Sequence, residues 1–346
     1  MAAKILFLDS FDHYATAQLG LKWNSVIGAN CTVASGNQRT GSQCLHIGGG
    51  AFGPRLTFSS LVTVVGSSAY NPVGGRGGGI LVLGSDTDGQ VWLNANGSGQ
   101  VSVTNNVFGD TTPPAFNIFV PAQFNQVQGV YARYELKVTC GNPGSFILRI
   151  NGVQALNVTG VQTNPHFTGV LNFFQLNGAG GGVVDSCHDD TYLATDFLGD
   201  IIVVENTPNA DGHYAAWTPL VAGPHFSQVN EIPPDGDVSY VSSSNIGDID
   251  TYKIPNTGYT PPIQVLGVQS VIYCRKDLAG TRIIAPVIRQ GGVDAVMADF
   301  SLPLTTYTYA KQVYDLGGDT SLNPATGLAW TQADLTAAEF GQKVTG

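Results

Sequence analysis

Charged side chains are scarce in this chain. Asp, Glu, Lys and Arg make up only 12% of its 346 residues, against about a quarter in an average globular protein. Glycine (44 residues) and small neutral polar residues take their place. Because Lys and Glu are good helix formers, their shortage favours β-strands over helices. The net charge of −10 repels phosphate, so we expect no nucleic acid partner.

The chain also lacks the spacings typical of metal sites and the long apolar runs of membrane segments. No CxxC pair occurs among the cysteines and the six histidines are scattered, so the spacing indicates no zinc or redox site. Cys31 and Cys44 could lie on neighbouring strands, but we interpret the cysteines as free, buried thiols. They are Cys31, Cys44, Cys140, Cys187 and Cys274. The N-terminal apolar run is interrupted at Asp9, unlike a signal peptide. We therefore expect synthesis in the cytoplasm and no insertion into a membrane.

Familiar catalytic motifs are missing as well. None of the four glutamates lies in the ExDxE pattern of jelly-roll glycoside hydrolases, and GxSxG and HExxH do not occur. The glycine-rich runs 74–79 and 178–182 do not link a strand to a helix and have no GK[ST] after them. They are therefore interpreted as loops, not as phosphate sites. The sequence predicts that the chain is not an enzyme and binds no cofactor.

What the chain has is strand periodicity. In 134–139, apolar and polar residues alternate as in a half-buried strand. Phe146–Ile150 and Val153–Val158 then flank Asn151-Gly152, the pair that favours a type I′ hairpin turn. Further candidate strands recur about every ten residues, as in a sandwich or jelly roll. They are 4–8, 44–47, 56–65, 79–83, 90–93, 101–104, 116–120, 170–176 and 191–194. We expect FLDSFDHY and VVDSCHDDTYLA to lie side by side.

The pattern changes after GDIIVVEN (199–206), which itself resembles a strand. Residues 207–262 are rich in proline and have little periodicity, but they carry aromatic anchors. Between Glu205 and Tyr252 there are seven acidic residues and no Lys or Arg. We interpret 207–262 as a long ordered connection, either simply solvated or lying against a basic neighbouring protein. Protection of this segment from proteases in an assembled particle would favour the second alternative.

Strand patterns resume from residue 263 and include 305–315. Residues 331–334 form a capping box, which predicts a helix over 334–340 ended by Gly341, with a last strand at 342–345. The sequence therefore predicts an all-β chain, an N-terminal antiparallel jelly-roll sandwich followed by a second β-rich domain with one short helix. We place the first domain at 1–206 and the second at 207–346.

Few residues stand out as a site. Asp185, Asp189 and Asp190 form a carboxylate cluster that could hold calcium at a jelly-roll rim. The alternative, which we favour, is that Asp189 and Asp190 alternate on a strand, one capping a turn and the other solvated. Tyr70 and Trp92 are the candidates for stacking on a glycan, although alternation places Trp92 inward or outward with equal ease.

Two parts of the chain resemble known families. Residues 5–200, with FDHY, YELKV, ILRINGVQAL and HDDTYLA, resemble the laminin-G/concanavalin-A-like jelly-roll superfamily. Residues 199–346, with GDIIVVENTPNADGHYAAWTP, SSSNIGDIDTYKI and GLAWTQADLTAAEFGQKV, resemble the downstream part of tailed-bacteriophage virion proteins. The resemblance implies a structural protein of the virion, in a tail, fibre or head-surface position, that forms a homo-oligomer or binds other virion proteins. The alternative is a carbohydrate-binding, lectin-like module that contacts a host surface glycan.

Overall fold

The computed structural model divides into two compact units, Leu8–Val204 and Met1–Phe7 with Glu205–Gly346. The boundary between the two domains predicted from the sequence follows residue 206. The described residues are 3–26, 28, 30–48, 52–85, 88–105, 116–165, 169–178, 185–255, 263–303, 305–316 and 321–346. None of the helices among these residues is long and apolar enough to cross a membrane.

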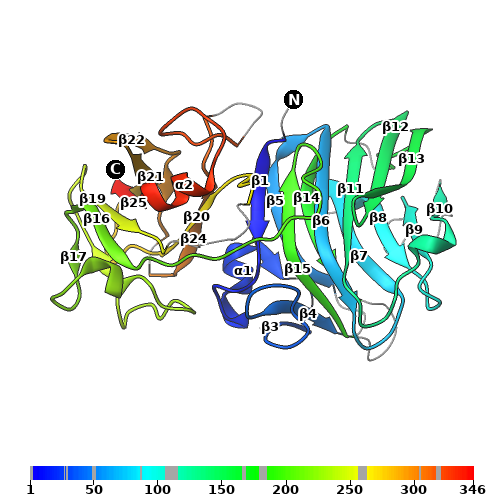
Figure 1. Ribbon diagram of the computed structural model, residues 1–346, viewed down its shortest axis with the longest axis horizontal. Coiled ribbons are helices and arrows are strands. Elements are labelled where there is room, and N and C mark those ends of the chain that lie inside the picture. The colour runs from blue at the N-terminus through cyan, green and yellow to red at the C-terminus, as the bar shows by residue number, and fades with distance from the viewer. Residues whose placement is uncertain are drawn as a thin grey trace. The chain divides into compact units, whose positions relative to one another are not determined.

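The first unit is a sandwich of two antiparallel sheets (Figure 1). One sheet has seven strands in the order β10-β9-β8-β7-β14-β5-β2. Its strands are β2 (Ser25–Val26), β5 (Phe52–Leu61), β7 (Gly78–Ser85), β8 (Asp88–Ala95), β9 (Val101–Thr104), β10 (Asn117–Phe119) and β14 (Leu171–Asn177). Strands β7 to β10 pair in chain order, whereas β14 pairs with both β7 and β5 from far along the chain, as in a jelly roll.

The other sheet has eight strands, in the order β13-β12-β11-β6-β15-β4-β3 with β1 also paired to β15. Its strands are β1 (Ile5–Asp9), β3 (Cys31–Ala34), β4 (Cys44–Gly48), β6 (Thr63–Pro72), β11 (Ala132–Thr139), β12 (Gly144–Ile150), β13 (Val153–Val161) and β15 (Asp185–Ala194). The expected pairing of the first strand with the late VVDSCHDDTYLA segment is confirmed.

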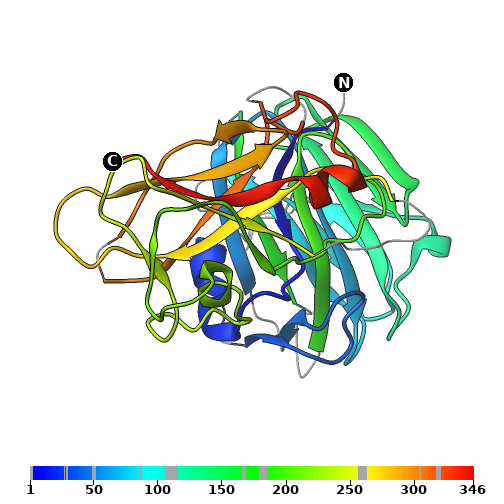
Figure 2. The same cartoon turned by 60° about the vertical axis from the view of Figure 1, so that its left-hand side comes forward.

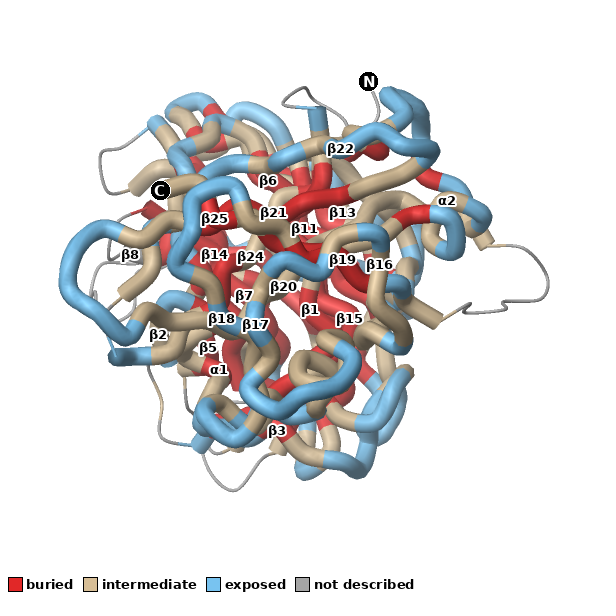
Figure 3. The backbone as a smooth tube through the Cα atoms, turned by 90° about the vertical axis from the view of Figure 1, so that its left-hand side faces the viewer, coloured by how far each residue is buried: buried red, intermediate tan, exposed pale blue. Residues whose placement is uncertain are grey.

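The core of the first unit lies between these sheets. Gly66 on β6 lies so close to the facing sheet that a Cβ there would be 2.9 Å from the Phe174 ring and 3.2 Å from Leu83. Both of these side chains are fully buried. Strands β6 and β15 are buried along almost their whole length, as the red tube in Figure 3 shows.

The hairpin that the sequence predicts is present. Strands β12 and β13 pair directly around Asn151 and Gly152, whose φ values are +50° and +77°. Two successive positive φ angles define the type I′ turn, which matches the twist of the strands. The alternation in β11 is confirmed by its pairing with β12, Leu136 lying opposite Leu148.

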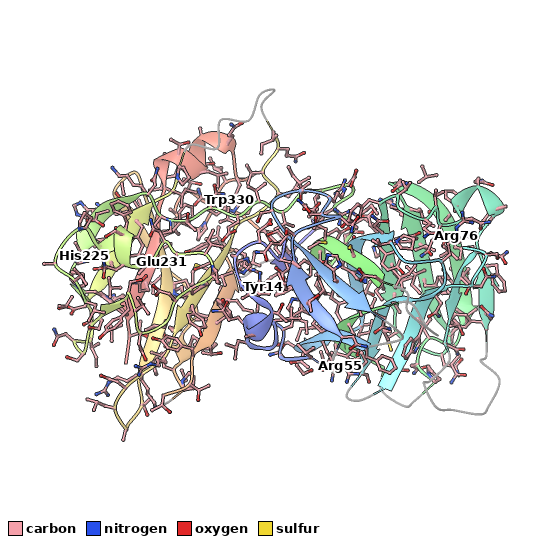
Figure 4. The ribbon with its side chains drawn as sticks, turned by 90° about the horizontal axis from the view of Figure 1, so that it is seen from below. Tyr14, Arg55, Arg76, His225, Glu231 and Trp330 are labelled. Atoms are coloured by element: carbon pink, nitrogen blue, oxygen red, sulfur yellow. The ribbon has the colours of Figure 1, made fainter. Side chains whose placement is uncertain are left out.

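A buried charge network closes one end of the first unit. Asp9, at the end of β1, accepts hydrogen bonds from Lys22 Nζ (2.9 Å), Tyr14 Oη (2.6 Å) and Trp23 Nε1 (2.5 Å). Lys22 belongs to helix α1 (Leu19–Lys22), which follows η1 (Thr16–Gln18). Tyr14 is labelled in Figure 4. Lys22 and Asp9 are almost completely buried, so their charges are compensated by each other and by these hydrogen bonds.

The second unit is also β-rich (Figure 2). Its main sheet has six strands, β16 (Ala210–Ala215), β19 (Ile249–Lys253), β25 (Glu339–Val344), β21 (Ile283–Gln290), β22 (Val293–Val296) and β23 (Phe300–Ser301). Two strand pairs accompany it, β17 (Thr218–Pro219) with β18 (Val241–Ser242) and β20 (Gln269–Cys274) with β24 (Thr308–Val313). Its core includes Tyr314 and Trp330, the latter labelled in Figure 4.

Three local predictions differ from the structure. The capping box at Thr331 is present, but helix α2 (Gln332–Ala337) ends earlier than expected because the next residues pair as β25. Segment 199–206 forms no strand; side chains rather than a neighbouring strand bind its backbone. The segment 207–262 is more than a connection, since it supplies β16 and β19 to the main sheet. Short helices η2 (Ala122–Phe124) and η3 (His225–Gln228) complete the described elements.

Candidate functional site

The outer face of the seven-stranded sheet carries a row of polar and aromatic side chains. Phe174 and Leu83 on this sheet point inward to Gly66, so residues next to them in the strands point outward. The outward set is aligned across strands by register: Gln175 lies opposite both Arg55 and Val82, and Val82 lies opposite Trp92. We call Phe52, Arg55, Trp92, Gln175 and Asn177 the outer-face cluster.

An aromatic pair lies over this face. The rings of Trp92 on β8 and Phe52 on β5 meet edge to face with centroids 6.2 Å apart, although two strands, β7 and β14, separate β8 from β5 in the sheet. Gly89 makes room for the indole, because a Cβ there would lie 2.4 Å from Trp92 Nε1. The two rings therefore extend toward each other above the strands between them.

A chain of hydrogen bonds runs beneath the rings. Arg55, which extends from β5 (Figure 4), donates from Nε to Gln175 Oε1 at 2.9 Å. Gln175 Nε2 in turn donates to Asn177 Oδ1 at 2.8 Å. The Arg55 guanidinium lies 4.0 Å from the centre of the Phe173 ring, which orients it further. These hydrogen bonds fix the orientation of both side-chain amides. Asn177 Nδ2 is the last donor in the row.

Two donors of the outer-face cluster are buried without an acceptor among the described residues. They are Asn177 Nδ2 and Trp92 Nε1. A buried N–H group without an acceptor costs about 1–3 kcal/mol, so such groups are rare in folded proteins. Two N–H donors, a guanidinium and ring faces are the groups that recognise a ligand rich in oxygen, through its hydroxyl or carboxylate oxygens and its C–H surface.

The two residues that the sequence proposed for glycan stacking have different positions. Trp92 is half-buried on the outer face and belongs to the cluster. Tyr70 is only 1% exposed and packs edge to face on Tyr134 and His188. Its ring therefore has no free face for a sugar in this structure, because a residue of this size on the interior side of a central strand fills the core.

The three aspartates proposed for calcium do not converge. Asp185 and Asp189 lie four residues apart on β15, and the Asp185 carboxylate lies 2.9 Å from His46 Nδ1. Asp189 accepts hydrogen bonds from the backbone N–H groups of Arg39, Thr40 and Asp190. Burial, and then the neighbouring charge of Asp190, raise the pKa of Asp189 to about 8. Calcium prefers ionised, accessible carboxylates, so this arrangement does not favour the ion.

Asp190 anchors the segment that leaves the sandwich. It lies at a bulge between β15 and β6, with φ +46°. Its carboxylate accepts from Arg39 Nη1, Thr40 Oγ1 and the Val203 N–H, and its carbonyl accepts from Arg133 Nη1. Every carboxylate oxygen of Asp189 and Asp190 thus has a protein donor. We give these two residues a structural role. The expectation that one of them is solvated is wrong, since both are fully buried.

Sequence reasoning missed Arg55, Gln175 and Asn177. These residues belong to different strands, and only the register of β5 with β14 brings them together. The available signal was the polar Gln175 and Asn177, which flank the apolar Leu176 at alternate positions of the strand. On a strand whose apolar residues already fill the core, such residues indicate a second face with its own contacts.

Comparisons with known proteins found solved structures of low similarity. No protein family matches the sequence, and no curated protein matches it significantly. Solved structures do match. An endo-β-1,4-glucuronan lyase from Trichoderma reesei has 12% identity and a TM-score of 0.43, with 57% of this chain and 98% of that chain covered. The PL-14 alginate lyase from Aplysia kurodai has 11% identity and a TM-score of 0.42, with 56% and 100% covered. Galectin LEC-6 from Caenorhabditis elegans has 12% identity and a TM-score of 0.29, with 40% and 88% covered.

All three TM-scores are below 0.5, so the sandwich architecture rests on the sheet order of the structure itself. The matches overturn the prediction that the chain is not an enzyme, because the matched structures include polysaccharide lyases. That prediction considered hydrolysis, for which paired carboxylates are the usual mark.

Proposed function

We propose that this chain is a bacteriophage particle protein whose first unit binds an acidic host-surface glycan on the outer face of the seven-stranded sheet. The observation that carries the glycan site is the oriented row from Arg55 through Gln175 to Asn177, which ends in a buried donor under the Phe52 and Trp92 rings.

The charge of the outer-face cluster selects among glycans. Arg55 is always ionised and presents a planar fork that fits a carboxylate. Its Nε donates to Gln175 Oε1 and its guanidinium lies against the Phe173 ring, which fixes its orientation. A uronic acid unit would pair its carboxylate with Arg55 and place its C–H face against Trp92. Neutral glycans would keep the stacking contact and lose the ion pair.

The particle role rests on the resemblance of residues 199–346 to virion proteins. The segment from Glu205 to Tyr252, which has seven acids and no Lys or Arg, offers a surface for a basic neighbouring protein or a second copy of the chain. Cross-linking followed by mass spectrometry on purified virions tests this part. Cross-links from the second unit to other virion proteins or to another copy are expected, and their absence from intact particles would contradict the particle role.

Polysaccharide binding tests the glycan site. Glucuronan and alginate should bind the purified chain more tightly than neutral glucans, as measured by affinity electrophoresis and calorimetry. Arg55→Ala and Trp92→Ala should each weaken binding about 5- to 100-fold, which corresponds to about 1–3 kcal/mol for a lost charged hydrogen bond or stacking contact.

A matched control is available on the other sheet. The Arg149 guanidinium lies 3.9 Å from the centre of the Phe197 ring, nearly the same stacking as Arg55 on Phe173, so Arg149→Ala removes a similar pair from another face. It should leave binding unchanged. Equal losses in both arginine variants, or no binding to any acidic polysaccharide, would contradict the proposed site. The same samples show whether unsaturated products form, which distinguishes cleavage from binding.

A further inference from the structure

A cluster of two cysteines and one histidine lies on the eight-stranded sheet, apart from the outer-face cluster. Cys44 and His46 are two residues apart on β4, and His46 lies directly opposite Cys187 on β15. Side chains two apart on a strand, and those opposite each other in an antiparallel pair, share one face. Their sulfur and nitrogen atoms all lie within 4.8 Å of one another.

The distances fit the corners of a tetrahedron around a small ion. Cys44 Sγ lies 3.4 Å from His46 Nε2, and Cys187 Sγ lies 3.7 Å from the same nitrogen. Bonds of about 2.3 Å to sulfur and about 2.0 Å to nitrogen, at tetrahedral angles, place these donors about 3.6 Å apart. We propose that Cys44, His46 and Cys187 bind a divalent ion of the zinc class.

Two further groups complete the arrangement. The Gly36 carbonyl oxygen lies 3.3 Å from Cys44 Sγ and 3.0 Å from His46 Nε2, which is the position of a fourth donor. Asp185 Oδ2 lies 2.9 Å from His46 Nδ1. A carboxylate on Nδ1 directs Nε2 to the metal and fixes the ring, the usual outer partner of a metal-bound histidine.

A second observation supports a ligand at this face. Asn71 on β6 lies directly opposite Cys187, on the side of β15 away from His46. It is only 4% exposed, and its Oδ1 has no hydrogen-bond donor among the residues that the structure describes. A buried amide oxygen beside the sulfur atoms is an additional polar group that a cation or its bound water would satisfy.

The contacts from Cys44 to His46 and from His46 to Asp185 are also those of a nucleophile, a base and a carboxylate that orients the base. Cys44 and Cys187 have no exposed surface, however. A substrate carbonyl cannot reach either sulfur, whereas a single ion needs only a small opening. Two adjacent thiols are also better suited to metal binding than to acyl transfer, for which one thiol suffices.

Metal uptake by the full-length chain is the test. Protein stripped with chelator under reducing conditions should take up one zinc per chain, measured by elemental analysis. Cobalt should give thiolate-to-cobalt charge-transfer bands and the intense visible bands of a tetrahedral site. These spectra require no variant, so they decide the question even where a substitution prevents folding.

Variants then assign the ligands. Cys44→Ser and Cys187→Ser should each lower zinc affinity at least about 100-fold, and Asp185→Asn, which only orients His46, about 10- to 100-fold. Cys140→Ser is the matched control, since Cys140 is another buried cysteine outside the cluster, and it should keep wild-type affinity. Zinc below about a tenth of an equivalent, cobalt without thiolate bands, or a Cys140 variant that loses as much as Cys44→Ser would overturn the proposal.

Discussion

Replacing His188 by glutamine should make the first unit less sensitive to acid. His188 is completely buried on β15. Its Nε2 donates to the Asn177 carbonyl at 2.8 Å, and its Nδ1 lies 3.0 Å from Ser68 Oγ. Burial lowers the pKa of His188 to about 4, from an ordinary value of 6.5, and the hydrogen bond to Asn177 only partly opposes this. The ring is therefore neutral in the folded protein over most of the acidic range.

The sign and size of the effect follow from this shift. Below pH 6.5 the unfolded chain binds a proton at His188 that the folded chain does not, so the free energy of unfolding falls as the pH falls. The loss begins near pH 6.5, reaches about 2 kcal/mol at pH 5 and approaches about 3 kcal/mol at pH 4. Above pH 6.5 the contribution is complete and constant.

Urea unfolding of the first unit at pH 7 and pH 5 measures this contribution. His13, whose pKa burial lowers to about 3, adds a contribution of the same sign, so the comparison is between His188→Gln and wild type at each pH. The variant should be less stable at pH 7 but should lose about 2 kcal/mol less between pH 7 and pH 5. Ser68→Ala, which keeps the imidazole, should retain the wild-type pH dependence. Equal pH dependence in His188→Gln and wild type, or a ring-proton NMR titration of His188 near pH 6.5, would refute the reasoning.

Two further substitutions test the packing of the first unit by thermal and urea unfolding. Gly66→Ala should destabilise it by about 1–3 kcal/mol, because the new Cβ meets the Phe174 ring. The control is Gly97→Ala, whose Cβ would meet nothing within 4 Å. Equal losses of stability in the two variants would contradict the close approach of the sheets. Lys22→Met should cost about 3–5 kcal/mol because it leaves Asp9 buried without its cation. The control is Lys137→Met, which removes a partly exposed ion pair with Asp196 and should cost about 1 kcal/mol or less. A similarly small loss of stability in Lys22→Met would show that the buried ion pair contributes little.

Local patterns in the sequence predicted much of the fold. The Asn151-Gly152 turn, the alternation in β11 and the capping box at Thr331 each depend on a few adjacent residues, and all three are present. The helix end near Gly341 was wrong because β25 pairs with both β19 and β21 there. Pairing with distant strands overrode the local preference of that glycine for a helix end.

The sites were harder to predict because they depend on long-range register. Cys44 and Cys187 are far apart in sequence and have no recognisable spacing, yet the pairing of β4 with β15 brings them together at His46. The outer-face cluster likewise requires that β5 pair with β14, which no single segment encodes. The aspartates 189 and 190 were conspicuous in sequence for a structural reason, since they bind the backbone of neighbouring loops.

The anchoring of residues 199–204 determines how the first unit responds to a pulling force. Arg39 and Arg133 both donate to the Ile201 carbonyl, and Asp190 accepts from the Val203 N–H, so the chain that leaves the sandwich is fastened beside the central strand β15. Tension applied beyond Glu205 reaches the bond at Val203 and then the two bonds at Ile201. These bonds would have to break before the force reaches strand β15. A particle protein that holds a surface glycan under load would gain a mechanically strong junction from this arrangement.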